Sequence, residues 1–257
     1  MTFRRHDGPR GGASDAPAEV PAPAEPLLEL RGVTAGYGRI QVLHGVDLAV
    51  PEGAVFALLG PNGAGKTTSL RVAAGLHEPT GGGVYLGGHR VNGAKPEELA
   101  RRGVCTVPEG RGVFPNLTVR ENLQIATFAG VPLEKVETIA YDRFPRLGER
   151  RNQLSGTMSG GEQQMLAMAR ALATDPALLL LDELSMGLAP LVVEELYRIV
   201  AELAETGVSI LVVEQFARTV LGVADVAAIM VNGRVTRVGA PADLEEELSA
   251  HYLGATT

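Results

Sequence analysis

Several residue types are scarce in this chain of 257 residues, and each shortage excludes a class of protein. Tryptophan is absent and all aromatic residues together make up 4% of the chain, so a surface that stacks the bases of single-stranded nucleic acid is not expected. The single cysteine, Cys105, rules out an intramolecular disulfide and any cysteine-based zinc or iron–sulfur site, and it suits a reducing compartment. The longest apolar runs, residues 177–181 and 208–213, are far shorter than the roughly 18 residues of a membrane-spanning helix.

Positive charge is also in short supply. The chain has 23 Lys and Arg residues against 30 Asp and Glu residues, a formal net charge of −7. Proteins that wrap nucleic acid usually present a basic field to the phosphates. We therefore expect no nucleic-acid partner, and a chain that reaches a membrane only through another protein.

The first 26 residues differ in composition from the rest of the chain. They are rich in Pro, Ala and Gly and show no hydrophobic period, so they cannot bury enough apolar surface to offset the entropy of ordering. We predict a disordered tail over residues 1–26, to which we assign no function. Residues 27–257 are predicted to form one catalytic domain.

The remainder alternates short strand-like runs with helical stretches. Two glycines, Gly87 and Gly88, separate short apolar segments and predict a tight hairpin. Thr118 and Glu121 form the T-x-x-E capping box that opens a helix at about Val119. The early hairpin indicates an antiparallel β lobe and the later alternation indicates a mostly parallel sheet, which together predict an α/β fold. The expected strands cover residues 27–30, 55–59, 104–107, 178–181, 209–213 and 227–231.

Residues 60–68 read Gly-Pro-Asn-Gly-Ala-Gly-Lys-Thr-Thr and directly follow a strand-like run, in agreement with the P-loop pattern G-x-x-x-x-G-K-[ST]. Glycines let the backbone curl so that successive N–H groups point at a phosphate, and the next helix adds the positive end of its dipole. Lys66 would bring a positive charge to the β- and γ-phosphates, and Thr67 would offer a hydroxyl to Mg²⁺. The predicted nucleotide ligands from this loop are Gly60, Asn62, Gly63, Gly65, Lys66, Thr67 and Thr68.

A P-loop needs a second metal-side carboxylate at the end of a buried strand. Asp182 and Glu183 follow a run of leucines, which satisfies that requirement. We predict that Asp182 lies near Mg²⁺ and that Glu183 polarises the attacking water. Hydrolysis of ATP would then depend on positioning and charge neutralisation, without a covalent intermediate.

Upstream of this strand, residues 158–164 read Met-Ser-Gly-Gly-Glu-Gln-Gln. Ser159 and Glu162 form a second capping box, so the segment could simply start a helix. Gly160 and Gly161 are poor helix formers, however, and a capped helix N-terminus stripped of side chains is also an anion site. The sequence alone leaves both interpretations open.

The order of these motifs resembles the ATP-binding cassette (ABC) family of P-loop NTPases, whose signature is LSGGQ, and the resemblance covers residues 27–257. It implies a mostly parallel core sheet, an antiparallel β lobe and an inserted helical subdomain at about residues 119–158. It also implies that two cassettes pair head to tail, so that each ATP is held by the P-loop of one and the signature of the other. By the same resemblance Tyr37 stacks on adenine, residues 185–190 form the D-loop, and the signature residues Ser159, Gly160 and Gly161 contact the nucleotide across the interface.

Some positions depart from the family pattern. The Q-loop has Glu109 where Gln is usual, and an anionic side chain could face Mg²⁺ or accept a hydrogen bond from water but would repel phosphate. We hypothesise that Glu109 senses the membrane subunit. The switch position has Gln215 in place of His, and Gln215 could hydrogen-bond the γ-phosphate but cannot shuttle a proton as an imidazole can. Met158 and Leu184 are also unusual and are expected to be tolerated packing changes.

The chain resembles one branch of the family in particular, the smaller ATPase subunit of branched-chain (hydrophobic) amino acid uptake systems. The resemblance implies three kinds of partner: integral-membrane permease subunits, a second ABC ATPase subunit in a homo- or heterodimer, and indirectly a solute-binding protein. It also implies a peripheral location at the cytoplasmic face of the inner membrane, with ATP and Mg²⁺ as cofactors. The alternatives are a urea or short-chain amide importer, another ABC transporter such as a lipopolysaccharide exporter, and a non-transport cassette acting on nucleic acid or ribosomes. The segments that carry this resemblance are residues 107–111, 161–167, 187–190, 213–215 and 252–254.

Overall fold

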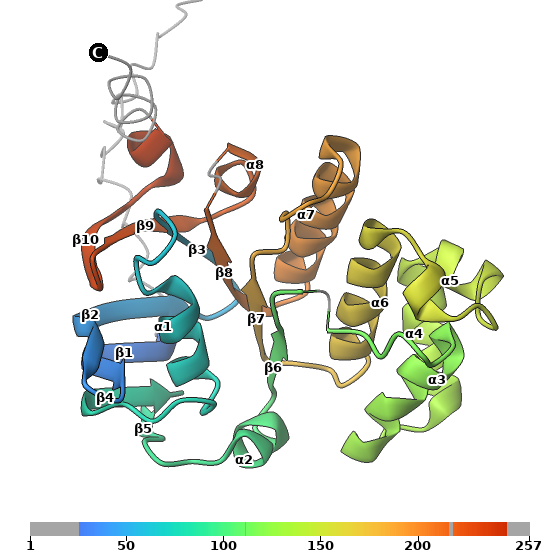
Figure 1. Cartoon of the computed structure of the whole chain (residues 1–257), viewed down its shortest axis with the longest axis horizontal. Helices are drawn as coiled ribbons and strands as arrows, with labels where there is room; N and C mark the ends of the chain where they lie inside the picture. Colours follow the sequence, from blue (N-terminus) through green and yellow to red (C-terminus); the bar gives the residue numbers. More distant parts are fainter. Residues whose placement is uncertain (1–25, 111, 216–217, 246–257) are drawn as a thin grey trace, which may run out of the picture.

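The computed structural model describes residues 26–110, 112–215 and 218–245, which form two sheets flanked by helices (Figure 1). Figure 1 shows the smaller sheet at one end of the molecule, a cluster of short helices at the other end, and the larger sheet between them. The tail predicted over residues 1–26 lies outside the described residues except for Pro26, which begins a strand.

The larger sheet contains, in spatial order, β10 (Arg234–Gly239), β9 (Val226–Val231), β3 (Val55–Leu59), β8 (Ser209–Glu214), β7 (Leu178–Asp182) and β6 (Val104–Val107). Neighbouring strands are parallel except for β10, which is antiparallel to β9. Every residue of β3, β7 and β8 is buried, as is typical of parallel strands that are covered on both faces. The mostly parallel sheet predicted from the sequence is therefore confirmed.

The smaller sheet contains, in spatial order, β2 (Ile40–Pro51), β1 (Pro26–Tyr37), β4 (Gly81–Leu86) and β5 (His89–Arg90). All of its pairs are antiparallel, and Gly87 and Gly88 form the predicted turn between β4 and β5, both with positive φ. The sequence analysis missed β2, although Val46, Leu48 and Val50 are buried there in alternation with exposed residues.

Alternate residues of β3 divide the hydrophobic core into two clusters. Phe56 and Leu58 pack with the smaller sheet and with helix α1 (Lys66–Ala73). The other residues of the strand pack with α6 (Gly160–Leu172) and α7 (Pro190–Glu205) on the opposite face. The larger sheet is thus the middle of three layers. The smaller sheet and α1 form one outer layer, and α6 and α7 form the other.

The helices that follow β6 in the sequence form the cluster at the right of Figure 1. They are α3 (Val119–Gln124), the 3₁₀ helix η1 (Ile125–Ala129), α4 (Leu133–Arg143), α5 (Pro145–Glu149) and the 3₁₀ helix η2 (Ser155–Thr157). Helix α3 begins with the predicted capping box, in which the Thr118 N–H donates to Glu121 Oε2 over 2.7 Å and the Glu121 N–H donates to Thr118 Oγ1 over 3.2 Å.

Two short helices complete the described chain, α2 (Pro96–Arg101) before β6 and α8 (Arg218–Leu221) after β8. Among the residues that the structure describes, no helix combines the length and the apolar character needed to cross a bilayer.

Candidate nucleotide site

The loop between β3 and α1 is shaped by glycines that no other residue could replace without displacing neighbours. A Cβ at Gly60 would lie 2.1 Å from the backbone oxygen of Met230 in β9. Gly65 has a φ of 106°, and a Cβ there would lie 2.9 Å from Leu43 Cδ2. Gly63 also has a positive φ, 78°. The loop therefore packs closely against β9 and β2 and turns tightly into α1. The backbone N–H groups at the N-terminus of α1 can then bind a phosphate.

Lys66 is the buried cation of this loop. Its side chain is 4% exposed, and Nζ donates to the backbone oxygens of Gly60 over 2.9 Å and Pro61 over 3.2 Å. Burial lowers the pKa of Lys66. Nζ also lies 3.9 Å from Glu183 Oε1, which brings two of the predicted catalytic residues together.

Thr67 and Asp182 meet at the predicted metal position. The Thr67 hydroxyl donates to Asp182 Oδ1 over 3.0 Å, although the two residues are 115 positions apart in the sequence. Hydroxyl and carboxylate oxygens are ligands that Mg²⁺ prefers, and Mg²⁺ usually takes further ligands from phosphate and water. Within the described ranges no three His, Cys, Asp or Glu side chains cluster as a metal site, so a Mg²⁺ ion here would share its coordination with a nucleotide.

Burial raises the pKa of Asp182 to about 6. The hydrogen bond from Thr67 lowers this pKa, whereas the charges of Glu109 and Glu183 raise it further. A buried carboxylate with this pKa is a group that a divalent cation would stabilise, because the cation favours the ionised form. The residues present therefore fit Mg²⁺.

Replacing Asp182 by Asn is expected to raise the Tm of the nucleotide-free protein more at pH 8 than at pH 4.5, while Mg²⁺-dependent hydrolysis is lost. Because the folded protein raises the pKa of Asp182 from 3.8 to about 6, the folded state binds more protons than the unfolded state between these values. The free energy of unfolding contributed by Asp182 therefore falls as the pH rises through that window and stays low above it. An equal change in Tm at the two pH values would contradict this account of the buried charge.

Glu183 occupies a backbone conformation that residues with a Cβ rarely adopt. Its φ is 48°, a left-handed conformation that costs about 1–3 kcal/mol for a non-glycine residue and persists only when its surroundings hold it. One such restraint is the Glu183 N–H, which donates to the backbone oxygen of Val213 over 2.9 Å. The side chain lines a recess of about 420 Å³ together with Gln164 and Met186. Water could reach the carboxylate through this recess.

The predicted adenine residue, Tyr37, ends β1 and is 44% exposed. Its ring centroid lies 4.5 Å from that of His77, with 32° between the ring planes, and Arg71 Nη1 donates to its hydroxyl over 3.4 Å. His77 in turn lies with Nε2 at 3.0 Å from the backbone oxygen of Gly36. The sequence analysis missed Arg71 in α1 and His77 in the turn after α1, which together hold Tyr37 in place.

Tyr37→Ala is expected to weaken ATP binding by about 1–3 kcal/mol, the usual contribution of an aromatic ring that stacks on a base. Tyr37→Phe should bind ATP nearly as well as the wild type, since stacking does not need the hydroxyl. The matched control is Tyr85→Ala, because Tyr85 is another ring of the smaller sheet and packs under Arg31 at 4.1 Å. The measurement is the ATP dissociation constant, and an unchanged value for Tyr37→Ala would remove this residue from the site.

The signature segment starts α6 with a complete capping box. The Ser159 N–H and hydroxyl both donate to Glu162 Oε2, over 3.0 and 2.9 Å, and the Glu162 N–H donates back to Ser159 Oγ over 3.4 Å. A Cβ at Gly161 would lie 2.4 Å from Val192 Cγ1 of α7. Close packing of α6 on α7 therefore accounts for Gly161 without an anion, and the capping interpretation of Ser159 is confirmed.

The signature and the P-loop are far apart within one chain. In Figure 1, α6 and α1 lie on opposite sides of β6 and β7. Ser159, Gly160 and Gly161 are thus not brought to the nucleotide loop of their own chain, so their predicted contact with nucleotide requires a second cassette.

Gln215 and Glu109 lie at the ends of two other strands of the larger sheet. Gln215 is half-buried and directly follows β8, while Glu109 is exposed after β6, and its charge acts on Asp182 and Lys66. The sequence analysis missed Glu214, a carboxylate that is only 1% exposed. Every residue of β8 is buried, so no burial period marks Glu214, which in the sequence is simply a polar residue after an apolar run.

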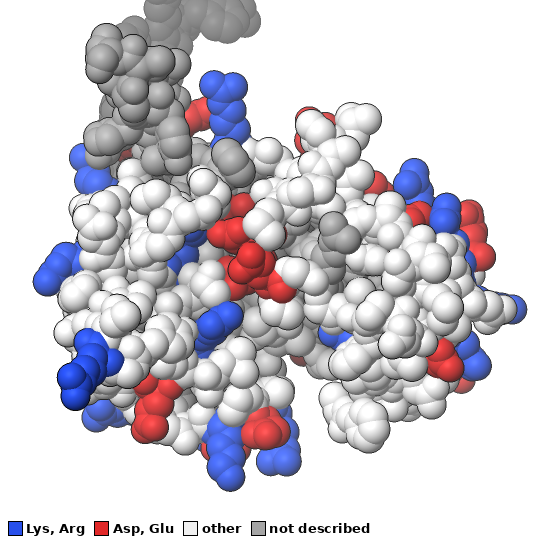
Figure 2. Space-filling model, viewed as in Figure 1, with Lys and Arg blue, Asp and Glu red and all other residues white. Residues whose placement is uncertain are grey.

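Acidic side chains gather near the middle of the face shown in Figure 2, over the region where β7 and β8 lie in Figure 1. Asp182, Glu183 and Glu214 all stand at the ends of these strands, and Lys66 is held among them. A nucleotide that enters this field brings further negative charge, which a nearby lysine such as Lys66 and a divalent cation can offset.

This arrangement defines a P-loop nucleoside triphosphatase: a buried strand leads into a glycine loop around a buried lysine, and a helix begins in that loop. The carboxylates at the end of β7 complete the site. The sequence model described as ABC transporter matches residues 43–185. The chain belongs to the ABC transporter family, and it is an ATPase.

Individual relatives extend this assignment to most of the chain. The high-affinity branched-chain amino acid transport ATP-binding protein BraG of Pseudomonas aeruginosa is 41% identical over 236 residues, which cover 89% of this chain and 100% of BraG. The probable branched-chain amino acid transport ATP-binding protein LivF of Archaeoglobus fulgidus is 37% identical over 224 residues, covering 86% and 94%. A dimeric ATP-binding cassette in a post-hydrolysis state bound to ADP and Pi is 26% identical, with a TM-score of 0.75 over 83% of this chain and 98% of the other.

Proposed function

We propose that this chain is the ATPase subunit that powers a permease importing branched-chain (hydrophobic) amino acids. The observation that carries the proposal is the similarity to BraG, which extends over the whole of that protein at 41% identity. LivF, whose name refers to the same class of solute, supports the proposal over nearly its full length.

In the proposed reaction Lys66 binds the β- and γ-phosphates in place of the backbone oxygens that it now contacts, and Glu183 orients the attacking water and accepts its proton. Thr67 and Asp182 would hold Mg²⁺, which when bound neutralises charge on the phosphates. Gln215 would donate a hydrogen bond to the γ-phosphate from its side-chain amide. Glu109, which follows β6, would respond to contact with the permease and affect the ATPase site.

The proposed ATP-bound state pairs two cassettes, so that Ser159 and Gly161 of one face the P-loop of the other. Two exposed apolar side chains support this arrangement: Met186, which lines the catalytic recess and is 50% exposed, and Leu191 near the start of α7, which is 79% exposed. Such residues in the segment that follows Glu183 are expected at an interface that forms and breaks. The similar cassette that is dimeric and bound to ADP and Pi gives the pairing of two cassettes a precedent.

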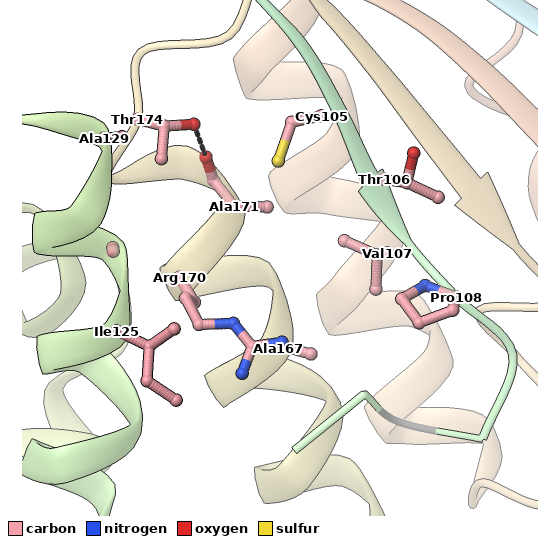
Figure 3. Close-up of a pocket in the computed structure, with 11 residues that line it drawn as sticks. Cys105, Thr106, Val107, Pro108, Ile125, Ala129, Ala167, Arg170, Ala171 and Thr174 are labelled. Atoms are coloured by element: carbon pink, nitrogen blue, oxygen red, sulfur yellow. Dashed lines mark hydrogen bonds between the residues drawn. The ribbon is translucent and has the colours of Figure 1, made fainter. Parts of the chain in front are cut away.

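The proposed permease contact is an apolar pocket of about 200 Å³ between β6 and the helices η1 and α6 (Figure 3). Arg170 reaches into this pocket from α6, and its Nη2 donates to the backbone oxygen of Gly112. Among the described side chains, Arg170 Nη1 is a buried donor without a hydrogen-bond partner. A permease segment that fills the pocket could supply a carbonyl or carboxylate oxygen to Nη1. The proposal then places the chain at the cytoplasmic face of the membrane, where it contacts the permease.

The test is uptake of labelled leucine and, in parallel, labelled urea by cells in which Glu183→Gln replaces the wild-type chain. Loss of leucine uptake alone supports the proposal, because it ties hydrolysis at Glu183 to amino acid import. Loss of urea uptake alone keeps the mechanism and changes the solute. If both activities persist, the chain serves another transporter, and the proteins that co-purify with it become the evidence to follow.

A further inference from the structure

We propose that Glu214 is a positioning residue of the ATPase site, which fixes the turn that carries Glu183 by holding Ser185 against the end of β8. This inference rests on the proposed role of Glu183 in hydrolysis. It assigns a function to a buried carboxylate that the P-loop mechanism does not use.

Glu214 stands at an apolar position of a buried strand. Ile210 and Val212, the preceding residues on the same face of β8, pack into the core beneath α7. The next residue in this row is a glutamate that is only 1% exposed. Burying a carboxylate costs free energy that an apolar side chain would not, so its hydrogen-bond partners must be present to offset that cost.

The partners of Glu214 come from two segments beyond β7. The Ser185 N–H donates to Oε1 over 2.8 Å, and the Ser185 hydroxyl donates to Oε2 over 2.9 Å. The Tyr197 hydroxyl, from α7, donates to Oε1 over 2.7 Å. One carboxylate thereby joins the end of β8, the first residue of the D-loop and the helix that follows the D-loop.

The adjacent residue of β8 completes the restraint. Val213 accepts the backbone hydrogen bond from Glu183, and Glu214 accepts two hydrogen bonds from Ser185. The turn from Glu183 to Ser185 is therefore held at both ends by consecutive residues of one strand. This double attachment explains how the left-handed backbone of Glu183 is maintained, and it keeps the carboxylate 3.9 Å from Lys66.

The same attachment connects three functional segments. Gln215, the predicted γ-phosphate contact, follows Glu214 directly, and the D-loop starts at Ser185. A shift of Gln215 on loss of the γ-phosphate would move Glu214 and, through Ser185, the segment that faces the second cassette. This connection depends on the hydrogen bonds that the Glu214 side chain accepts, and not on its negative charge.

Glu214→Leu tests the proposal, since leucine continues the apolar row of β8 and removes both bonds to Ser185. We expect kcat for ATP hydrolysis to fall about 10- to 100-fold, as for a misplacement of a catalytic group by about 1 Å, with KM for ATP unchanged within about twofold. Glu214→Gln should restore most of the rate, because the Ser185 hydroxyl can rotate to accept from the new amide. In a Glu183→Gln background, Glu214→Leu should lower kcat no further.

Ser209→Ala is the matched control. Ser209 is a buried polar residue at the other end of β8, and its hydroxyl accepts from the Gly53 N–H over 2.8 Å. It should lower Tm without changing kcat. If Glu214→Leu does not fold, the double variant Glu214→Gln with Ser185→Ala takes its place as the test. In this variant the new amide faces a methyl group and has no hydroxyl to donate to. Its kcat should fall about tenfold more than the product of the two single effects.

The positioning role would be overturned if folded Glu214→Leu, or the double variant in its place, had the wild-type kcat. It would also be overturned if kcat fell in Glu214→Leu and Glu214→Gln did not restore it. Glu183→Gln separates this failure from that of the mechanism. If Glu183→Gln hydrolyses ATP at the wild-type rate, the role of Glu183 is wrong. If Glu183→Gln abolishes hydrolysis while Glu214→Leu keeps the wild-type kcat, only the present inference is wrong.

Discussion

Glu183→Gln is expected to lower kcat for ATP hydrolysis by about 10²- to 10⁴-fold, the range that a general base contributes. Glutamine keeps the volume of the side chain and its left-handed backbone, so ATP should still bind. The substitution removes the anionic oxygen that is proposed to orient the water and take its proton. Because hydrolysis would no longer break the bridge between two cassettes, the variant should accumulate as an ATP-bound dimer.

Two measurements check this prediction on the same sample. Steady-state phosphate release gives kcat, and size-exclusion chromatography with ATP and Mg²⁺ reports whether the dimer persists. Glu205→Gln, the same substitution at an exposed position near the end of α7, is the control and should behave as the wild type. A Glu183→Gln protein that hydrolyses ATP at the wild-type rate would show that another group activates the water.

Much of the nucleotide site could be predicted because its residues are adjacent in sequence. The predicted P-loop ligands lie within residues 60–68, and the sequence pattern of the loop is enough to propose them. The structure adds why two of the glycines are needed, since a Cβ at Gly60 would meet the backbone oxygen of Met230 and Gly65 has a φ of 106°. Asp182 and Glu183 follow a short continuous apolar run, which is typical of a buried parallel strand. The fold class followed from the same alternation of strands and helices.

The parts that the sequence analysis missed depend on contacts between distant segments. Glu214 looks like an ordinary polar residue after a strand until Ser185 and Tyr197 are placed against it, 29 and 17 positions away. His77 has no ligand spacing in the sequence, and its role appears only when β1 brings Tyr37 beside it. Strand β2 was missed because Gly45, with a φ of 79°, interrupts its alternation. For Glu214 and His77 the missing information is tertiary, whereas for β2 it is a local interruption of the strand pattern.

Lys66→Met is expected to weaken ATP binding by about 2–5 kcal/mol, the usual cost of removing one partner from a buried, hydrogen-bonded charge pair. Methionine retains the apolar stem but cannot bind phosphate. The remaining groups around the loop are largely acidic, since Asp182, Glu183 and Glu109 all act on Lys66. The ATP dissociation constant in the presence of Mg²⁺ measures the loss, and Lys135→Met, an exposed residue of α4, is the control.

The proximity of Lys66 to Glu183 gives this prediction a second part. With Nζ only 3.9 Å from Oε1, part of the loss in Lys66→Met arises because the Glu183 charge is left to repel the nucleotide. In a Glu183→Gln background that repulsion is absent, so Lys66→Met should cost less binding free energy than it does in the wild type. Equal losses in both backgrounds would show that Lys66 acts only through its own bonds to phosphate and that the acidic field of β7 does not affect nucleotide affinity.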